Sequence, residues 1–454
     1  MRMRMLLESH VAPGRLVLWR VAPDTIAAAQ AALEHPAPPS YVQEEHLRQA
    51  LARRREGRRL PRWHAGAIEI AGPATPAAVE NALTGLLRRH DALRSGFRTE
   101  GGRLRRFLVA PEDIALVPED AGEFDTSAAL RERLGTYFDG AIDTLEWPAY
   151  AFAAVLRDSS ATVFTAFDHL NSDAHSVATA LREVQELYTA DVEGRAPSLE
   201  QASSYLDFCT AQRQDPIPGG EVAAAVSHWS EFLSDGLLPQ APVKTAVIAG
   251  PPPVLVNHEF QFLDDSIVTA CEKWCRANGQ TLFTGLLAAL GQAAFAVSGR
   301  TVFRTIIPLQ TRRNPAAPSL GWYINAAPVR FTVSPAGALE ETLADAGTAT
   351  RAALRHLGVP FERVEYELGG ELAVQTAFWT SYLDFRPLPG NRHQPPLDAQ
   401  LLTGPRTGTG VDLFLNRTEA GLSVRARHPD VEAARKHIAV YLATFSDTVT
   451  ALVS

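Results

Sequence analysis

The sequence predicts an α/β protein, α+β in its topology, with two lobes of similar construction. Its 454 residues exceed what one compact hydrophobic core accommodates, so we expect two domains of roughly 200 residues each. Segments with helical and with strand periodicity alternate irregularly in both halves, and we find no repeat with a period of about 20–50 residues. We expect the first lobe to span residues 1–190 and the second lobe residues 191–454.

In the first half, residues 15–21 are typical of an opening strand, and residues 67–71 alternate like a strand. Thr75 followed by Pro76 is a typical helix start, because threonine caps the first turn and proline suits its first position. Further on, two apolar runs flank three polar residues, which predicts a β-hairpin. The strands expected in this half are residues 15–21, 67–71, 150–157 and 162–168, and the helices residues 40–55, 75–90 and 173–188.

In the second half, acidic residues at 264–265 begin a helix that Asn278 and Gly279 end. The next helix is rich in small apolar residues, which predicts that it is buried. A β-branched run after it predicts a central strand. The expected elements are helices at residues 264–278, 281–297 and 431–453, and a strand at residues 301–308.

Composition and charge exclude several classes of protein. Hydrophobic residues make up 46% and charged residues 21% of the chain, the balance of a soluble globular protein. The net charge of −8 is unlike that of a dedicated nucleic-acid binder, so we expect no nucleic-acid partner. One arginine cluster fits either a solvated helix end and loop or a docking surface for an acidic partner. The cluster comprises Arg53, Arg54, Arg55, Arg58, Arg59 and Arg62.

The three cysteines, Cys209, Cys271 and Cys275, are too few and odd in number for a disulfide framework, which favours a reducing compartment. Cys271 and Cys275 share a helical face, but no further ligands accompany them, so we expect no metal site. The N-terminus lacks an apolar run of signal-peptide length, and no window reaches the ~18 apolar residues of a membrane span. We therefore expect a cytoplasmic protein without a membrane span.

The stretch most informative about function is residues 164–175, which places His169 and Asp173 in an H-x-x-x-D pattern where a strand gives way to a helix. The end of a strand often faces a cleft, and a neutral imidazole accepts a proton near neutral pH, so the pattern predicts His169 as a general base. The alternative is a histidine satisfied by a nearby backbone group. Asp173 is equally suited to cap the following helix.

Seven segments between about residues 80 and 365 carry motifs that follow one another in a consistent order. They are L-x-x-R-H-x-x-L-R within residues 82–94, H-x-x-x-D within 169–174, residues 204–208 and 228–233, P-x-x-x-R at 308–312, G-x-x-x-N-x-x-P-x-R at 321–330 and V-P-F-E within 359–364. Together they resemble the condensation domains of nonribosomal peptide synthesis, and residues 169–174 resemble the second half of that family's H-H-x-x-x-D-G motif. The opening segments, residues 13–20 and 39–47, are more similar to the stand-alone, ester-forming polyketide-associated acyltransferases.

This resemblance implies two lobes, each like chloramphenicol acetyltransferase, that form a V around a central tunnel with the histidine near its middle. One end of the tunnel admits an acyl thioester on the phosphopantetheine arm of an acyl or peptidyl carrier protein, or on coenzyme A. The other end admits a small-molecule acceptor. No permanently bound cofactor is implied, and we expect a monomer.

The resemblance also suggests roles for individual residues. Asp173 is expected to form a structural ion pair with Arg312 that fixes the loop, in addition to its possible role as a cap. Asn325 matches a family asparagine that lies near the tunnel. Its alternative role is to form hydrogen bonds with the backbone of a turn. Trp322 is expected to be lining or core, without a role in the chemistry.

The chain departs from the family pattern at two positions. Asp168 stands where the family has its first histidine, and Ala174 where it has glycine. Asp168 is suited to orient His169 or the acceptor, although a strand-end aspartate is more often solvated. A methyl group at residue 174 is expected to narrow the approach to the thioester or to disturb a backbone N–H that steadies the oxyanion.

The leading interpretation is an acyltransferase that moves an acyl group to a hydroxyl or an amine in natural-product or lipid biosynthesis, with a slight preference for ester formation. One alternative is a remodelled member that binds a carrier-tethered intermediate without transfer. Another is a member that isomerises or cyclises that intermediate. The two departures, Asp168 and Ala174, motivate these alternatives.

Overall fold

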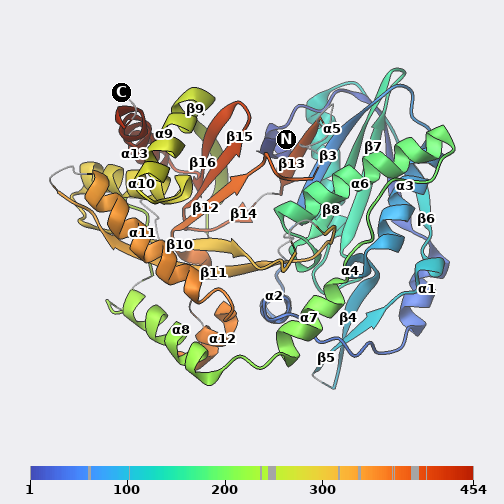
Figure 1. The fold of residues 1–454 in the computed structure, drawn as a ribbon. Coiled ribbons are helices and arrows are strands. Elements are labelled where there is room, and N and C mark those ends of the chain that lie inside the picture. Colours follow the sequence, from blue (N-terminus) through green and yellow to red (C-terminus); the bar gives the residue numbers. More distant parts are fainter. Residues whose placement is uncertain are drawn as a thin grey trace. The chain divides into compact units, whose positions relative to one another are not determined.

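The computed structural model describes residues 2–59, 63–101, 103–235, 238–243, 252–314, 317–335, 339–370, 372, 374–389, 398–404 and 406–452. The chain forms two compact units (Figure 1). The first comprises Met1–Pro216, Arg312–Tyr323 and Pro387–Gly404, and the second comprises Ile217–Thr311, Ile324–Arg386 and Pro405–Ser454. These units differ from the predicted ranges 1–190 and 191–454, because the first unit continues to Pro216 and two segments from late in the chain pack in it.

Among the described residues, the first unit is built on a mostly antiparallel sheet of seven strands, in which only β1 and β13 pair in parallel. The strand β13 comes from the second half of the chain and pairs with β3, which explains why the unit is discontinuous. In spatial order the strands are β1 (Arg2–Met5), β13 (Ala399–Thr403), β3 (Trp63–Ala71), β8 (Ser160–Asp168), β7 (Tyr150–Leu156), β2 (Gly14–Val21) and β6 (Leu116–Phe124).

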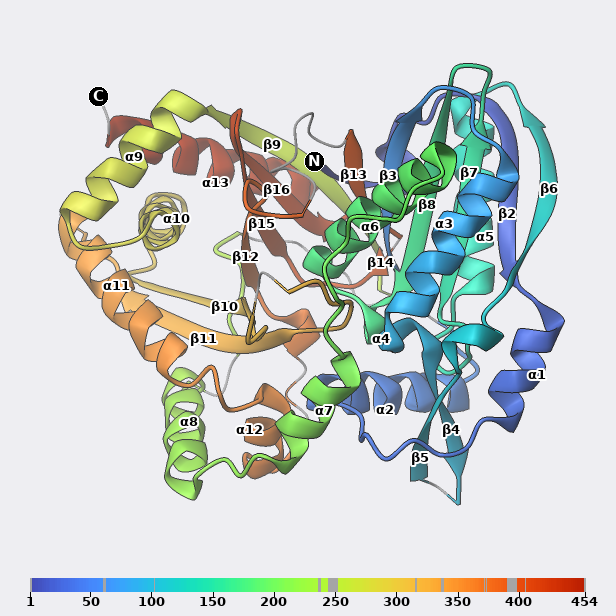
Figure 2. The same ribbon diagram turned by 45° about the vertical axis from the view of Figure 1, so that its right-hand side comes forward.

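Helices cover both faces of this sheet. The side chains of Phe164 and Ala166 in β8 belong to the core formed with Leu134 and Phe138 of α5 (Ser127–Ala141). Because successive side chains of a strand alternate between faces, the residues between them point toward α3 (Pro76–Arg89) and α6 (Ala174–Glu193), which pack together in front of the sheet in Figure 2. The other elements of this unit are α1 (Pro23–Ala31), α2 (Tyr41–Arg55), α4 (Asp91–Arg94), α7 (Tyr205–Gln214) and the hairpin of β4 (Ser95–Glu100) and β5 (Arg103–Leu108).

The second unit repeats this plan with its own seven-stranded sheet. Its strands in order are β11 (Ile324–Thr332), β10 (Val302–Gln310), β12 (Trp379–Asp384), β15 (Asp412–Thr418), β16 (Gly421–Pro429), β9 (Val254–Asp264) and β14 (Arg406–Thr407). One face carries α9 (Asp265–Ala277), α10 (Leu282–Ser298), α11 (Leu339–Arg355) and α13 (Glu432–Ala451), and the other carries α8 (Gly219–Phe232) and α12 (Phe361–Glu367).

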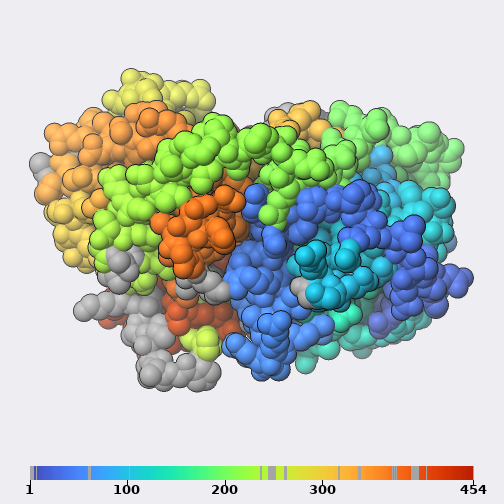
Figure 3. All heavy atoms as spheres, turned by 90° about the horizontal axis from the view of Figure 1, so that it is seen from below, coloured from blue at the N-terminus to red at the C-terminus, as the bar shows by residue number. Residues whose placement is uncertain are grey.

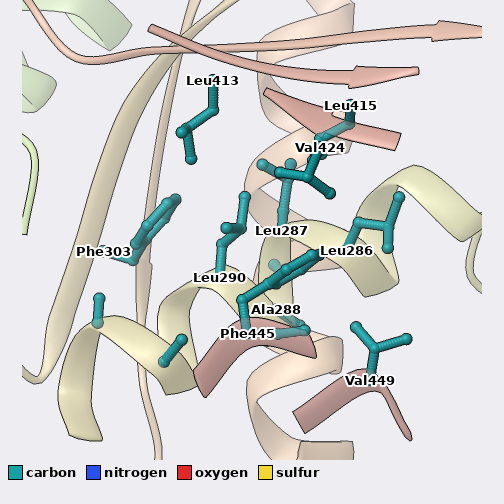
Figure 4. Close-up of a cluster of buried hydrophobic side chains, with 14 of the residues drawn as sticks. Leu286, Leu287, Ala288, Leu290, Phe303, Leu413, Leu415, Val424, Phe445 and Val449 are labelled. Carbon is teal, nitrogen blue, oxygen red and sulfur yellow. The ribbon is translucent and has the colours of Figure 1, made fainter. Parts of the chain in front are cut away.

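The core of the second unit is centred on α10. Its residues Leu286, Leu287 and Leu290 pack against Phe445 of α13 and Val424 of β16 (Figure 4). Small residues at neighbouring positions of α10 let the surrounding helices approach closely, which accounts for the burial that the sequence predicted. The mixed α/β class is therefore confirmed, and each predicted element is present with its ends shifted by a few residues.

Candidate active site

The predicted strand-to-helix connection forms a tight, buried loop. Strand β8 ends at Asp168, the single 3₁₀ turn η3 covers His169–Asn171, and α6 begins at Ala174. Asp168 caps the 3₁₀ turn by accepting a hydrogen bond from the N–H of Leu170 at 2.7 Å, and the hydroxyl of Ser172 donates to the carbonyl of Asp168 at 3.1 Å. These short-range bonds give His169 a fixed backbone position.

The imidazole of His169 is half-buried, and one of its nitrogens is committed to the loop. Its Nδ1 lies 2.7 Å from the carbonyl oxygen of Ser172, a backbone partner of the kind that the alternative interpretation of this histidine expects. Because a carbonyl oxygen only accepts, Nδ1 carries a proton, and in the neutral ring the lone pair is then on Nε2. A neutral imidazole held in this tautomer is suited to take a proton at Nε2.

Two aromatic rings contact His169. The indole of Trp322 stacks on the imidazole with ring centroids 3.8 Å apart and an angle of 22° between the planes. The ring of His64, from β3, meets it nearly edge-on with centroids 4.1 Å apart. Sequence reasoning assigned no role to Trp322 and did not single out His64, because both are far from His169 along the chain.

Asp168 is completely buried, so the expectation that it is solvated is wrong. Its Oδ1 lies 2.9 Å from Nε2 of His46 in α2, and its Oδ2 accepts a hydrogen bond from the hydroxyl of Thr144 at 2.8 Å. Burial alone raises the pKa of this carboxyl group, but His46 and the other donors outweigh burial and hold the pKa below its ordinary value. Asp168 is therefore an ionised acceptor for three donors.

Asp173 forms a buried ion pair with Arg312, as the family resemblance implies. Arg312 Nη2 lies 3.0 Å from Asp173 Oδ1, and the two side chains are 2% and 3% exposed. The same carboxylate caps α6 by accepting from the N–H of Ser176 at 2.7 Å, and it accepts from the N–H of Tyr323 at 3.2 Å. Burial raises the pKa of Asp173, but Arg312 and Ser176 together lower it below the usual value. Asp173 thus ties α6 to residues 312–323.

Close packing at Gly321 supports Trp322. A Cβ atom on Gly321 would lie 2.3 Å from the ring of Tyr205, so only glycine fits there. The hydroxyl of Tyr205 donates to the carbonyl of Trp322 at 3.2 Å, and the hydroxyl of Ser176 donates to the carbonyl of Gly321 at 2.7 Å. The glycine of the matched segment therefore serves to hold the tryptophan.

Asn325 belongs to the second unit and uses its full hydrogen-bonding capacity there. Its Nδ2 donates to the carbonyls of Leu357 and Val359 at 3.0 and 2.7 Å. Its Oδ1 accepts from the N–H groups of Ala326 and Phe361, both at 2.9 Å. This geometry matches the alternative role, in which the side chain satisfies the turn between α11 and α12.

The first turn of α6 places the remaining residues of the motif. Ala174 is the first helical residue and is half-buried. His175 is also half-buried, and burial together with the charge of Arg312 lowers its pKa to about 4. His175 is therefore neutral near pH 7.

The R-H segment that resembles the family helix is a structural clamp. His90 Nε2 lies 2.8 Å from Glu183 Oε2, and Arg89 Nε donates to the same oxygen at 2.9 Å. Glu183 is fully buried in α6, so this clamp joins the end of α3 to the helix that Asp173 caps. Burial opposes ionisation of Glu183, but His90 and Arg89 lower its pKa from 4.5 to about 2.

Glu183→Gln is expected to destabilise the protein by about 3 kcal/mol at pH 7, the free energy equivalent of this pKa shift. Because the folded-state pKa is the lower one, the contribution is complete above the unfolded-state value of 4.5 and is lost as the pH falls towards 2. The difference between the two proteins in urea unfolding is thus expected to fall by more than half between pH 7 and pH 3. A difference of the same size at both pH values would contradict this account.

The arginine cluster is partly neutralised. Arg54 lies 3.0 Å from both Asp143 and Glu146, and Arg59 lies 2.8 Å from Asp143. Arg62 is outside the described residues. These exposed pairs fit the solvated helix end and loop, although the alternative of a docking surface stays open.

A cavity of about 400 Å³ lies in the first unit between α1, α2 and the β4–β5 hairpin. Figure 3 shows the molecule from the side on which these elements lie. None of the predicted site residues lines the cavity. Its lining combines apolar side chains, which include Leu47, Leu51, Phe97 and Trp147, with the polar and charged side chains of Gln30, Arg54, Arg98, Thr99 and Glu146.

Among the described residues, no group of three or more His, Cys, Asp or Glu side chains is arranged to hold a metal ion. The same part of the chain contains no single helix with the length and apolar character to cross a membrane. Helices α9 and α10 meet that requirement only as a pair, bent by 100° between them.

Comparison with known proteins identifies the family. The model of the condensation domain matches residues 63–391. The chain belongs to the condensation-domain family. The expectation based on the seven matched segments is confirmed, and the match includes the loop at His169 and the segment with Arg312 and Trp322.

Two mycobacterial proteins are similar to this chain over much of their length. The 2'-acyl-2-O-sulfo-trehalose (hydroxy)phthioceranyltransferase PapA1 of Mycobacterium tuberculosis is 31% identical over 362 residues, which cover 78% of this chain and 69% of that protein. The acyltransferase PapA3 of the same organism is 29% identical over 454 residues, covering 95% and 92%. This condensation-family protein is accordingly an acyltransferase.

Solved structures share the condensation-domain fold. A PapA2 acyl transferase superposes with a TM-score of 0.88 at 24% identity and covers 100% of both chains. The first condensation domain of the CDA synthetase superposes with a TM-score of 0.73 at 18% identity and covers 93% of this chain and 97% of that one. The chloramphenicol-acetyltransferase-like fold class is thereby confirmed.

Proposed function

We propose that this acyltransferase forms an ester, moving an acyl group from a thioester to a hydroxyl with His169 as general base. The donor is the phosphopantetheine arm of a carrier protein or coenzyme A. The hydrogen bond between His169 Nδ1 and the carbonyl of Ser172 carries the proposal, because it makes Nε2 the basic nitrogen. A second support is that two mycobacterial relatives, PapA1 and PapA2, are named as acyltransferases of sulfated trehalose, whose free groups are hydroxyls.

In the proposed reaction, Nε2 of His169 takes the proton from the acceptor hydroxyl while its oxygen attacks the thioester carbonyl. The tetrahedral intermediate then collapses, the carbon–sulfur bond breaks, and the thiolate leaves. The protonated Nε2 returns its proton to that sulfur, so the products are an ester and a free thiol. Proton transfer of this kind typically contributes ~10²–10⁴-fold to the rate.

The proposal is tested by offering the protein acyl-coenzyme A and acyl-loaded carrier protein in parallel, each with hydroxyl and amine acceptors. Intact-mass analysis is expected to show the acyl mass added to a hydroxyl acceptor and an equal amount of free thiol. Amide products alone would contradict ester formation. Carrier binding without any product would favour the remodelled, non-transferring member, and an altered intermediate of unchanged mass would favour isomerisation.

The donor is decided by comparing kcat/KM for the two thioesters with the same acyl chain. A carrier-dependent enzyme is expected to use the carrier at least tenfold better than coenzyme A. Equal values would indicate that the thioester is recognised without the carrier protein.

A further inference from the structure

Two side chains of α2 hold the loop that carries His169. Gln43 Nε2 donates to the carbonyl of Leu170 at 2.9 Å, and His46 Nε2 lies 2.9 Å from Asp168 Oδ1. Residues three apart share a helical face, so one face of α2 binds both ends of the same short turn. Both residues lie in the segment 39–47, to which the proposed reaction so far assigns no role.

The direction of the bond between His46 and Asp168 follows from chemistry. The carboxyl of Asp168 is ionised and only accepts, so His46 Nε2 carries a proton and donates it. Both side chains are buried, at 4% and 0% exposure. A buried carboxylate that loses one of its donors is destabilised, and a shift of the loop relieves part of that cost.

His46 is also connected to His169 through the side chain of Trp322. Its ring meets the indole of Trp322 nearly perpendicularly, at 88° with centroids 5.3 Å apart. Trp322 in turn stacks on His169. The same imidazole thus supports the catalytic ring through the loop backbone and through the stacked tryptophan.

We propose that His46 is a positioning residue for His169, acting through Asp168 and Trp322. Together with Asp168, which stands at the family's first histidine, it fixes the direction of the basic nitrogen. This inference rests on the proposed role of His169 as general base. A displacement of about 1 Å at a reacting group can cost as much as ~10²-fold in rate, so the expected effect is on kcat.

The test separates the two routes with two substitutions. His46→Phe keeps a ring beside Trp322 and removes the N–H, whereas His46→Gln keeps an N–H donor near the position of Nε2 and removes the ring. We expect His46→Phe to lower kcat by about 10–100-fold with KM within about twofold of wild type, and His46→Gln to recover most of kcat. Thr144→Val, which removes the donor to Asp168 Oδ2, is expected to act in the same direction to a smaller extent.

A further comparison uses the His169→Ala background. If His46 acts only through His169, His46→Phe has no additional effect on the residual activity of His169→Ala. The inference would be overturned if His46→Phe lowered kcat by the same factor in the wild-type and His169→Ala backgrounds. It would also be overturned if soluble His46→Phe and Thr144→Val both had the kcat of the wild type. Wild-type activity of His169→Ala would instead overturn the proposed function. If His46→Phe does not fold, Thr144→Val and His46→Gln decide by the same kcat and KM comparison.

Discussion

Replacing His169 with alanine is expected to lower kcat by about 10²–10⁴-fold, the usual contribution of a general base. The substitution removes the nitrogen that takes the acceptor proton and leaves the thioester and acceptor contacts in place. We therefore expect KM for the thioester to stay within about threefold. The measurement is initial-rate kinetics of thiol release with the acceptor and donor that the wild type uses best.

The matched control is His175→Ala. This histidine is six residues further along the same connection, half-buried and neutral near pH 7, since its pKa is about 4. It has no role in the proposed proton transfer, so its removal is expected to change kcat by less than about threefold. A loss below about tenfold for His169→Ala, or equal losses for both variants, would rule out general-base catalysis by His169.

The sequence predicts those features of the fold that depend on neighbouring residues. Thr75 caps α3 and Asp173 caps α6, and both caps follow from short-range patterns. The hairpin of β7 and β8 follows from two apolar runs around a polar turn. The discontinuity of the first unit does not follow from neighbouring residues. The pairing of β13 with β3 joins residues more than 300 positions apart, and no local signal in the sequence encodes it.

The same limit applies to the candidate site. The motif identified His169 and Asp173, and the resemblance to condensation domains added Arg312. The rings and donors that hold them, His46, His64 and Trp322, come from other segments of the chain. The available sequence signal was an aspartate directly after the apolar run of β8, because an ionised carboxylate that is drawn into a core requires partners that the local sequence does not supply.

Breaking the pair of Arg312 and Asp173 is expected to produce the largest loss of stability. Both side chains are almost completely buried, so Arg312→Met leaves the Asp173 carboxylate without its cation. Removing one partner of a buried ion pair typically costs about 3–5 kcal/mol. Urea unfolding followed by tryptophan fluorescence measures the loss, and kcat is expected to fall as well, because the loop at His169 loses its anchor to residues 312–323.

A second substitution shows whether the loss of stability in Arg312→Met comes from the unpaired charge of Asp173 or from the changed volume of the side chain at residue 312. In Arg312→Met/Asp173→Asn, residue 173 still accepts from the N–H of Ser176 but no longer carries a buried charge. This double variant is expected to be more stable than Arg312→Met alone, whereas independent effects would make it less stable.

Glu119→Gln serves as the control, because the side chains of Glu119 and Arg20 are 43% and 56% exposed and their pair is expected to contribute no more than about 1 kcal/mol. If Arg312→Met costs no more than this control, the ion pair does not hold the site loop, and the hydrogen bonds of Ser176 and Tyr205 suffice to keep Trp322 against His169.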